Sequence, residues 1–156
     1  QEVLVKWDEI KRKTKGQKTQ GDSMKAVPLE LPALMRAEKI QSKARKAGFD
    51  WETADGAFDA LKGEIQELED AYRSKSAADI EDEFGDVLFS AVNVSRFLGV
   101  DSEEALTKAS NKFLKRYLIV EKLASERKIN MKETPIEELD KLWNEAKKIT
   151  AENSAE

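Results

Sequence analysis

Two pairs of acidic residues are the part of this sequence best suited to chemistry. Glu64 and Glu67 form one acid-x-x-acid pair, and Glu83 and Asp86 form a second. Residues three apart on a helix lie on the same face, so two antiparallel helices that face each other would bring four carboxylates together. At neutral pH such a group must be protonated or neutralised by cations. We therefore expect a divalent metal ion between the two pairs.

The absence of two residue types narrows the choice of metal. The 156-residue chain has no histidine and no cysteine, so the usual nitrogen and sulfur ligands of zinc, copper and iron are missing. A hard ion bound by oxygen atoms is expected instead, Mg²⁺ first and Mn²⁺ as a second choice. A di-iron helical bundle is excluded, because its Glu-x-x-His motifs need histidine.

Length, charge and hydropathy restrict the class of protein. A chain of 156 residues fits one domain with a sizeable core, and 40% apolar with 37% charged residues is typical of a helical protein with charged outer faces. The net charge of -4 argues against a nucleic-acid polymer as partner, although local basic residues could hold a small phosphate ligand. No membrane span or signal peptide is recognisable, so a cytoplasmic protein is expected. The start at Gln1 suggests a fragment or the second half of a longer protein.

The spacing of apolar residues and the positions of capping residues predict an all-α fold. Helices are expected over residues 1–13, from Pro32 to Gly48, from Thr53 to Ser74, from Ser76 to Leu98, from Asp101 to Leu123, and from Pro135 onward. Residues 11–25 are polar and contain glycine, which predicts a linker or a mobile loop. This divides the chain into an amino-terminal helix and linker (1–27), a helical domain (28–150) and a frayed tail (151–156).

The two acid pairs differ in how close they lie to the predicted apolar faces. On helix 53–74, Glu64 and Glu67 lie about 110° from the centre of the apolar stripe, which is formed by Phe58, Leu61, Ile65, Leu68 and Tyr72. A solvated acidic face would explain that pair alone. On helix 76–98, Glu83 lies only about 70° from the apolar centre, where an unpaired carboxylate is costly. Helix 76–98 is apolar nearly all round, so a subunit interface is expected on its second side.

Basic and aromatic residues provide the other candidates. Lys112 and Arg116 lie one helical turn apart, and opposite a carboxylate cluster they would bind the far end of a polyanionic ligand. Otherwise they are solvent-facing partners of nearby glutamates. Trp143, taken alone, is more typical of a core residue than of a base-stacking one. Residues 49–51 form a short aromatic connector, which is expected to be a packing clip rather than a surface that stacks on a ligand.

With these helices assigned, the sequence resembles the MazG family of nucleoside triphosphate pyrophosphohydrolases, in particular the carboxy-terminal half of a tandem MazG protein. The resemblance covers essentially the whole chain, and its matching segments are residues 31–37, 48–51, the two acid pairs, 111–113, Arg116 and Trp143. It implies a fold related to the dimeric all-α dUTPases and a homodimer. The implied reaction is the Mg²⁺-dependent cleavage of nucleoside triphosphates, NTP or dNTP, to the monophosphate and pyrophosphate.

The resemblance also implies roles for individual residues. The metal ligands would be Glu64, Glu67, Glu83 and Asp86, and the expected catalytic carboxylate is Glu67, with Glu64 beside it. The groups expected to bind substrate are Lys112 and Arg116 on the phosphates, Trp143 on the nucleotide, and the tract from Asp79 to Asp82 along the pocket. Asp79 stands where the family more often has a basic or polar residue.

Gly63 departs from the family pattern, which begins Glu-Glu-x-x-Glu. One explanation is drift, because a glycine in mid-helix costs only about 1 kcal/mol relative to alanine. The other is that an acid which orients the attacking water has been lost, and turnover is weakened. Gly63 therefore keeps open the alternative of a MazG domain that dimerises or binds nucleotide with little turnover. A separate alternative is a purely structural helical dimer whose acids are a solvated face with the basic residues as their partners.

Overall fold

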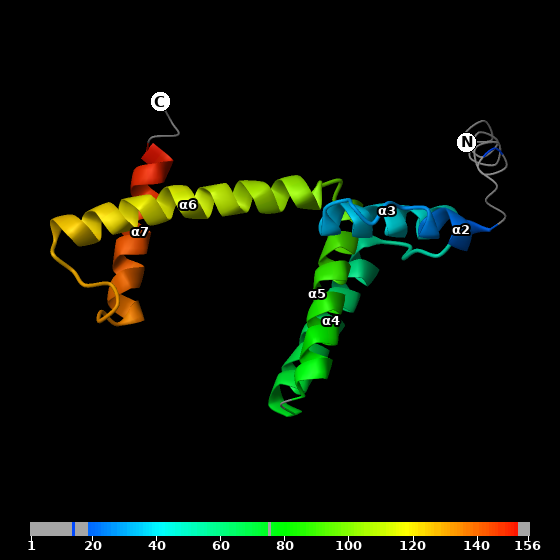
Figure 1. Cartoon of the computed structure of the whole chain (residues 1–156), viewed down its shortest axis with the longest axis horizontal. Coiled ribbons are helices and arrows are strands. Elements are labelled where there is room, and N and C mark those ends of the chain that lie inside the picture. Colours follow the sequence, from blue (N-terminus) through cyan, green and yellow to red (C-terminus); the bar gives the residue numbers. More distant parts are fainter. Residues whose placement is uncertain (1–13, 15–18, 75, 153–156) are drawn as a thin grey trace. The chain divides into compact units, whose positions relative to one another are not determined.

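The computed structural model describes residues 14, 19–74 and 76–152, and every regular element in them is an α-helix (Figure 1). The all-α prediction is therefore confirmed. The helices are α2 (Gln20–Lys25), α3 (Ala33–Lys46), α4 (Ala54–Ser74), α5 (Ala77–Phe97), α6 (Ser102–Glu126) and α7 (Ile136–Glu152). The chain forms two compact units, one ending at Glu103 and one beginning at Glu104. The helix predicted over 1–13 lies outside the described residues.

Local capping explains most helix bounds. Ser76 Oγ accepts a hydrogen bond from the Asp79 backbone N–H at 3.4 Å, which satisfies one of the free donors at the start of α5. Gly48 and Gly99 follow α3 and α5 with φ angles of 86° and 67°, a conformation that glycine adopts without Cβ strain. The predicted ends of these helices agree with the structure to within two residues.

Residues 20–25 form a helix, so the prediction of a linker is wrong there. The reason is a capping box: Thr19 Oγ1 accepts from the Asp22 N–H at 3.0 Å, and Asp22 Oδ2 accepts from the Thr19 N–H at 2.9 Å. Lys43 Nζ on α3 donates to Ser23 Oγ at 2.6 Å and joins the two helices. The polar composition of this segment concealed a short helix held by its cap and by α3.

The two prolines lie one position earlier than predicted. Pro32 is the N-cap of α3, and α7 begins at Ile136, directly after Pro135. The Pro135 carbonyl accepts from the N–H groups of Glu138 and Leu139 at 3.1 and 3.2 Å, as a residue just before a helix does. Thr134 Oγ1 donates to the Asn130 carbonyl at 2.7 Å and so belongs to the preceding turn. Proline still marks both helix starts, because its missing N–H costs nothing there.

Helices α4 and α5 pack side by side as an antiparallel hairpin in the first unit (Figure 1). The buried residues of α4 are Ala57 and Ala71, whereas Phe58, Ile65 and Tyr72 are 37%, 44% and 73% exposed. The predicted apolar stripe is therefore not the buried face. Small side chains let the helix backbones approach, so the alanine side faces α5, and the half-buried Glu64 shares that side.

Large apolar residues of α5 stay exposed in this single chain. Val92 and Val94 are buried, but Phe84, Leu88 and Phe89 are 43–53% exposed. No element among the described residues covers these side chains. The subunit interface expected on this side of the helix stays a prediction. Phe49 is 84% exposed, so the expected packing clip is wrong for this residue.

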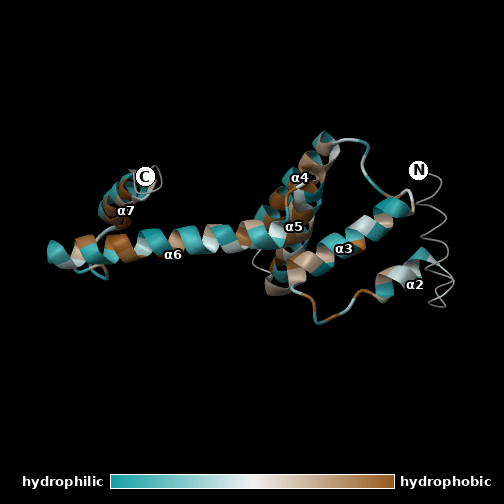
Figure 2. Cartoon of the chain, turned by 90° about the horizontal axis from the view of Figure 1, so that it is seen from above, coloured by the Kyte–Doolittle hydropathy of each residue, from teal (hydrophilic) through white to brown (hydrophobic). Residues whose placement is uncertain are grey.

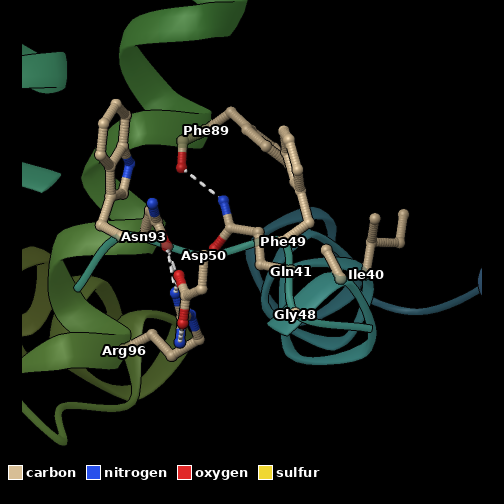
Figure 3. A pocket seen from close by; sticks show the side chains of 10 residues that line it. Ile40, Gln41, Gly48, Phe49, Asp50, Phe89, Asn93 and Arg96 are labelled. Carbon is tan, nitrogen blue, oxygen red and sulfur yellow. Dashed lines mark hydrogen bonds and ion pairs between the residues drawn. The ribbon is translucent and has the colours of Figure 1, made fainter. Parts of the chain in front are cut away.

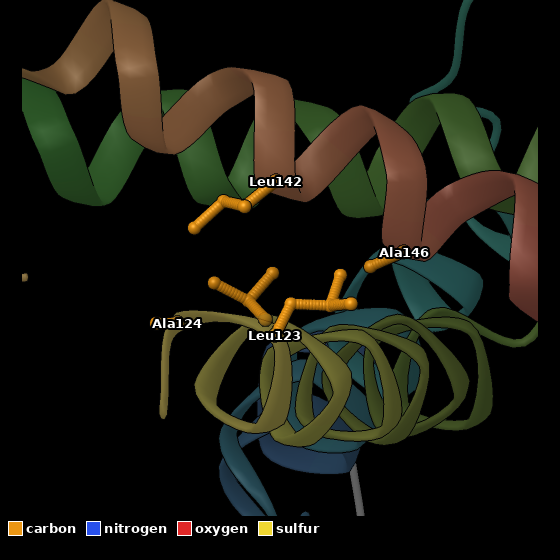
Figure 4. Close-up of a cluster of buried hydrophobic side chains, with 5 residues drawn as sticks. Leu123, Ala124, Leu142 and Ala146 are labelled. Carbon is orange, nitrogen blue, oxygen red and sulfur yellow. The ribbon is translucent and has the colours of Figure 1, made fainter. Parts of the chain in front are cut away.

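In the second unit, α6 and α7 pack through five buried residues (Figure 4), which are Val120, Leu123, Ala124, Leu142 and Ala146. Hydrophobic and hydrophilic segments alternate along α6 (Figure 2), as expected for an amphipathic helix. Helix α7 continues to Glu152, beyond the expected fraying point at 151, and residues 153–156 lie outside the description. None of the described helices has the length and apolar character of a membrane span.

Candidate functional site

The hairpin geometry decides which acids of α4 and α5 lie opposite each other. In the sequence, Glu64 and Asp86 each lie eleven residues from position 75, and Glu67 and Glu83 each lie eight residues from it. Both helices rise by the same ~1.5 Å per residue, so residues equidistant from the connection lie at the same height. The sequence therefore pairs Glu64 with Asp86 and Glu67 with Glu83 across the hairpin.

Three of the four predicted metal ligands come together in the structure. Glu64, Glu83 and Asp86 each offer a carboxylate oxygen, and these oxygens all lie within 4.8 Å of one another. Glu64 and Glu83 are half-buried and Asp86 is exposed. Glu67 is exposed and lies outside this group of three, one turn further along α4.

Crowding of like charges is reflected in the acidity of these groups. Partial burial raises the pKa of Glu64, and the Asp86 and Glu67 carboxylates raise it further. Partial burial also raises the pKa of Glu83, followed by the charges of Glu67, Asp86, Glu64 and Asp82. For each glutamate the strongest neighbouring charge is its partner across the hairpin. A cation bound between the helices would relieve this repulsion.

The donor set fits a hard divalent ion. All the donors are carboxylate oxygens, which suit Mg²⁺ and Mn²⁺ and not the softer transition metals. Ligands on opposite sides of Mg²⁺ are about 4.2 Å apart, twice its ~2.1 Å bond length. The observed spread of up to 4.8 Å is close to this value. The acids on α4 and α5 thus form a group that could bind a metal ion.

Two of the other predicted residues lie against each other in the second unit. The Arg116 guanidinium lies 5.9 Å from the centroid of the Trp143 ring, and Phe113 and Trp143 have centroids 5.1 Å apart. Arg116 Nε is buried without a hydrogen-bond partner among the described residues. Trp143 also packs against the α6–α7 core, which agrees with the interpretation of this residue taken alone, and its contact with the nucleotide stays a prediction. Lys112 is exposed one turn before Arg116.

The remaining predicted residues lie at or near the start of α5. Asp79 is exposed in the first turn, where its backbone N–H donates to the Ser76 side chain that caps the helix, and Asp82 is exposed one turn later. Asp82 lies close enough to Glu83 to raise its pKa. Gly63 is exposed on α4, and a Cβ at this position would meet no atom within 4 Å. A lack of room for a side chain therefore does not explain why this position is a glycine.

Sequence reasoning missed a cavity between α3 and α5. Its lining includes Gln41, Asn93 and Arg96, none of which was a candidate. The Arg96 guanidinium pairs with both carboxylate oxygens of Asp50, 46 residues earlier in the chain. Asp50 between two aromatic residues was the available signal, but its partner could not be identified without the fold.

Comparison with known proteins agrees with the resemblance found in the sequence. A model of the MazG nucleotide pyrophosphohydrolase domain matches residues 52–121, which include α4, α5 and most of α6. The nucleoside triphosphate pyrophosphohydrolase/pyrophosphatase MazG of Thermotoga maritima is 43% identical over 141 residues, which cover 90% of this chain and 54% of that protein.

Two further relatives match over most of this chain. The nucleoside triphosphate pyrophosphohydrolase of Escherichia coli K12 is 38% identical over 151 residues, 94% of this chain and 57% of that protein. The uncharacterized protein YabN of Bacillus subtilis is 38% identical over 148 residues, 94% of this chain and 30% of that protein. The chain spans a little over half the length of the relatives from T. maritima and E. coli. From the domain match and these identities, the chain belongs to the MazG family.

Proposed function

We propose that this protein hydrolyses nucleoside triphosphates to nucleoside monophosphate and pyrophosphate in a Mg²⁺-dependent reaction. The observation that carries the proposal is the convergence of Glu64, Glu83 and Asp86 within 4.8 Å, inside the segment that matches the MazG domain. The names of the relatives from T. maritima and E. coli support the same reaction. Mn²⁺ is the expected substitute for Mg²⁺.

The proposed metal ligands are Glu64, Glu83 and Asp86, with Glu67 as the fourth. When bound, the cation supplies positive charge that offsets the negative charge developing on the phosphate oxygens. Water attacks a phosphorus of the α,β bridge, a new O–P bond forms, and the bridging P–O bond breaks. Glu67, exposed at the edge of the group with Glu64 beside it, accepts the proton of the attacking water.

The proposed substrate-binding residues are Lys112, Arg116, Trp143, Asp79 and Asp82. Lys112 and Arg116 hold the phosphate chain, and the free Nε–H of Arg116 supports this role, because a buried donor without a partner is costly. Trp143 contacts the nucleotide through the part of its ring that stays exposed. Asp79 and Asp82 line the approach to the acids near the start of α5.

We further propose a homodimer that acts in the cytoplasm. Support for the dimer comes from the large apolar residues left exposed on α4 and α5, among them Ile65, Tyr72, Phe84 and Leu88. Light scattering coupled to size exclusion tests the dimer, and a monomeric mass at working concentration would contradict it. The compartment follows from the substrate, since nucleoside triphosphate pools are cytoplasmic.

The decisive test is the reaction itself. The chain is incubated with Mg²⁺ and each NTP or dNTP in turn, and monophosphate and pyrophosphate are measured separately. Equal amounts of the two products are expected, and their absence with every nucleotide would contradict the proposal. Formation of nucleoside diphosphate and inorganic phosphate would indicate that a different bond of the triphosphate is cleaved.

A second candidate is a nucleotide-binding or dimerisation module with weakened turnover. The observation in its favour is Gly63, which leaves no side chain where the family pattern has an acid. Metal-dependent nucleotide binding by calorimetry, without release of pyrophosphate, would select this candidate.

A further inference from the structure

A cavity of about 360 Å³ lies between α3, the loop that follows it and α5 (Figure 3). Its wall is mostly apolar, with Ile40 and Ala44 from α3, Phe49 and Trp51 from the loop, and Phe89 from α5. Phe49 and Trp51 are 84% and 50% exposed, so their rings are available to a guest. Sites for small molecules have similar volumes and similar aromatic walls.

One polar atom in this wall has no partner. Gln41 is only 7% exposed, and its Nε2 donates to the Phe89 backbone carbonyl at 2.8 Å (Figure 3). Because a carbonyl can only accept, this bond fixes the orientation of the amide and leaves Oε1 on the other side. Oε1 is buried and has no hydrogen-bond partner among the described residues. A buried acceptor without a donor is costly, so the position favours a ligand that brings an N–H group.

The charged end of the cavity is already neutralised. Arg96 donates from Nη1 to Asp50 at 2.9 Å and from Nη2 to the other Asp50 oxygen, while its Nε and Nη2 also donate to Asn93 Oδ1 at 3.3 and 2.7 Å. These bonds use four of the five N–H donors of the guanidinium. The cavity therefore does not select a phosphate, and a neutral planar ligand suits it better.

We propose that this cavity binds the heterocyclic base of the nucleotide, and that an exocyclic amine of the base donates to Gln41 Oε1. The aromatic side chains Phe49, Trp51 and Phe89 supply flat apolar surfaces on which a base can stack. Adenine, cytosine and guanine carry such an amine, whereas uracil and thymine do not. This proposal rests on the proposed function, of which it names the favoured bases.

The cavity lies close to the acidic group along α5. Phe89 and Asn93 follow Asp86 by three and seven residues, so they lie about 5 and 10 Å further along the axis and within roughly 60° of it around the helix. The sugar of a nucleotide can bridge a separation of this size. One nucleotide can thus present its phosphates to the acids and its base to Gln41.

Binding of the base is tested without metal or phosphate, on the whole chain. Adenosine is titrated while the amide signals of the Gln41 side chain and the indole N–H signal of Trp51 are followed by NMR. Both signals are expected to shift. Purine riboside, which lacks only the exocyclic amine, is expected to bind about tenfold more weakly. Equal affinity for the two nucleosides, or no shift at Gln41 and Trp51, overturns the proposal.

A pair of variants assigns the effect to Gln41. In Gln41→Leu the preference for adenosine over purine riboside is expected to disappear, whereas Gln66→Leu, on the exposed side of α4, is expected to retain it. A preference that persists in Gln41→Leu and is lost in Trp143→Ala would overturn the proposal. If Gln41→Leu does not fold, the two nucleosides still decide the question on the unaltered chain.

The same comparison can be made on the reaction. ATP is expected to exceed purine riboside triphosphate about tenfold in kcat/KM, and adenosine is expected to compete with ATP. Noncompetitive inhibition by adenosine would overturn the proposal, because it would show that adenosine and ATP bind at different sites. Absence of any hydrolysis would contradict the proposed function and leave the nucleoside titration as the separate test of the cavity.

Discussion

Two groups of carboxylates, one in each unit, have opposite electrostatic surroundings. In the first unit, Glu64, Glu83 and Asp86 crowd together, and the pKa values of both glutamates are raised. In the second unit, Glu145 accepts a hydrogen bond from Arg127 at 2.7 Å, and this bond lowers the pKa of Glu145. Charges that serve the fold are paired, whereas the crowded acids lower stability until a cation joins them. This contrast supports the proposal that the acids of α4 and α5 form the metal site.

Removal of a crowded acid gives the largest expected effect. Glu64→Ala or Asp86→Ala should lower kcat on the order of 10³-fold, because several kcal/mol of charge stabilisation are lost at 1.36 kcal/mol per factor of ten. Circular dichroism should show an unchanged helix content. Arg127→Ala is the matched control and should keep activity within about twofold. Activity within tenfold of the parent in both acid variants would remove the distinction between the two regions.

Restoration of an acid beside the group gives the next largest effect. We expect Gly63→Glu to raise kcat several-fold, since the position is open and adjoins Glu64. Gly63→Ala is the control, because either substitution should stabilise α4 by up to about 1 kcal/mol through helix propensity alone. The turnover number and the unfolding temperature are measured for both. An unchanged turnover number in Gly63→Glu would show that the missing acid has no role.

The pH dependence of stability should have opposite signs in the two regions. For Glu83 the folded-state pKa is raised above its usual 4.5, so the folded chain takes up a proton before the unfolded chain as pH falls. The contribution of the Glu83 carboxyl to the free energy of unfolding therefore rises as pH falls through the raised pKa. In EDTA at pH 7, Glu83→Gln should raise Tm by roughly 1–2 °C, and Mg²⁺ should stabilise the parent more than the variant. A lower Tm for the variant in EDTA would mean that the carboxylate is already neutralised.

The paired charges should give the smallest effect. The pKa of Glu145 is lowered, so its contribution is present above the unfolded-state pKa and is lost as pH falls through the folded value. Both partners are partly exposed, and solvent screens such pairs. Glu145→Gln should therefore lower Tm at pH 7 by no more than roughly 1 °C, with no difference from the parent at pH 2. A rise in Tm would contradict the pairing.

Much of the fold was predictable because helix formation is local. The bounds of α4 and α5 follow from Ser76, Gly99 and the apolar periodicity, and the structure agrees to within two residues. The short helix α2 was missed because its cap lies in a polar segment and its stability depends on the bond between Lys43 and Ser23. The buried face of α4 was assigned to its largest apolar residues, although the close approach of α5 selected Ala57 and Ala71.

The acids and the cavity also differ in whether the sequence alone could reveal them. The acid pairs could be found in the sequence because each pair is one helical turn, and their convergence needs only a hairpin with a short connection. The cavity could not be found, because Gln41 and Phe89 are 48 residues apart and the free Oε1 exists only once their hydrogen bond has formed. A buried polar atom without a partner is a property of packing, which no local pattern records.

By itself the sequence determined the helical class and indicated the four acids proposed as metal ligands, because residue type and one-turn spacing act over a few residues. Only the tertiary structure decided which three acids lie within 4.8 Å, which side of α4 is buried, and that an aromatic cavity with an unpaired acceptor lies further along α5. These features arise from contacts between helices distant in sequence, and their geometry depends on how closely the backbones pack.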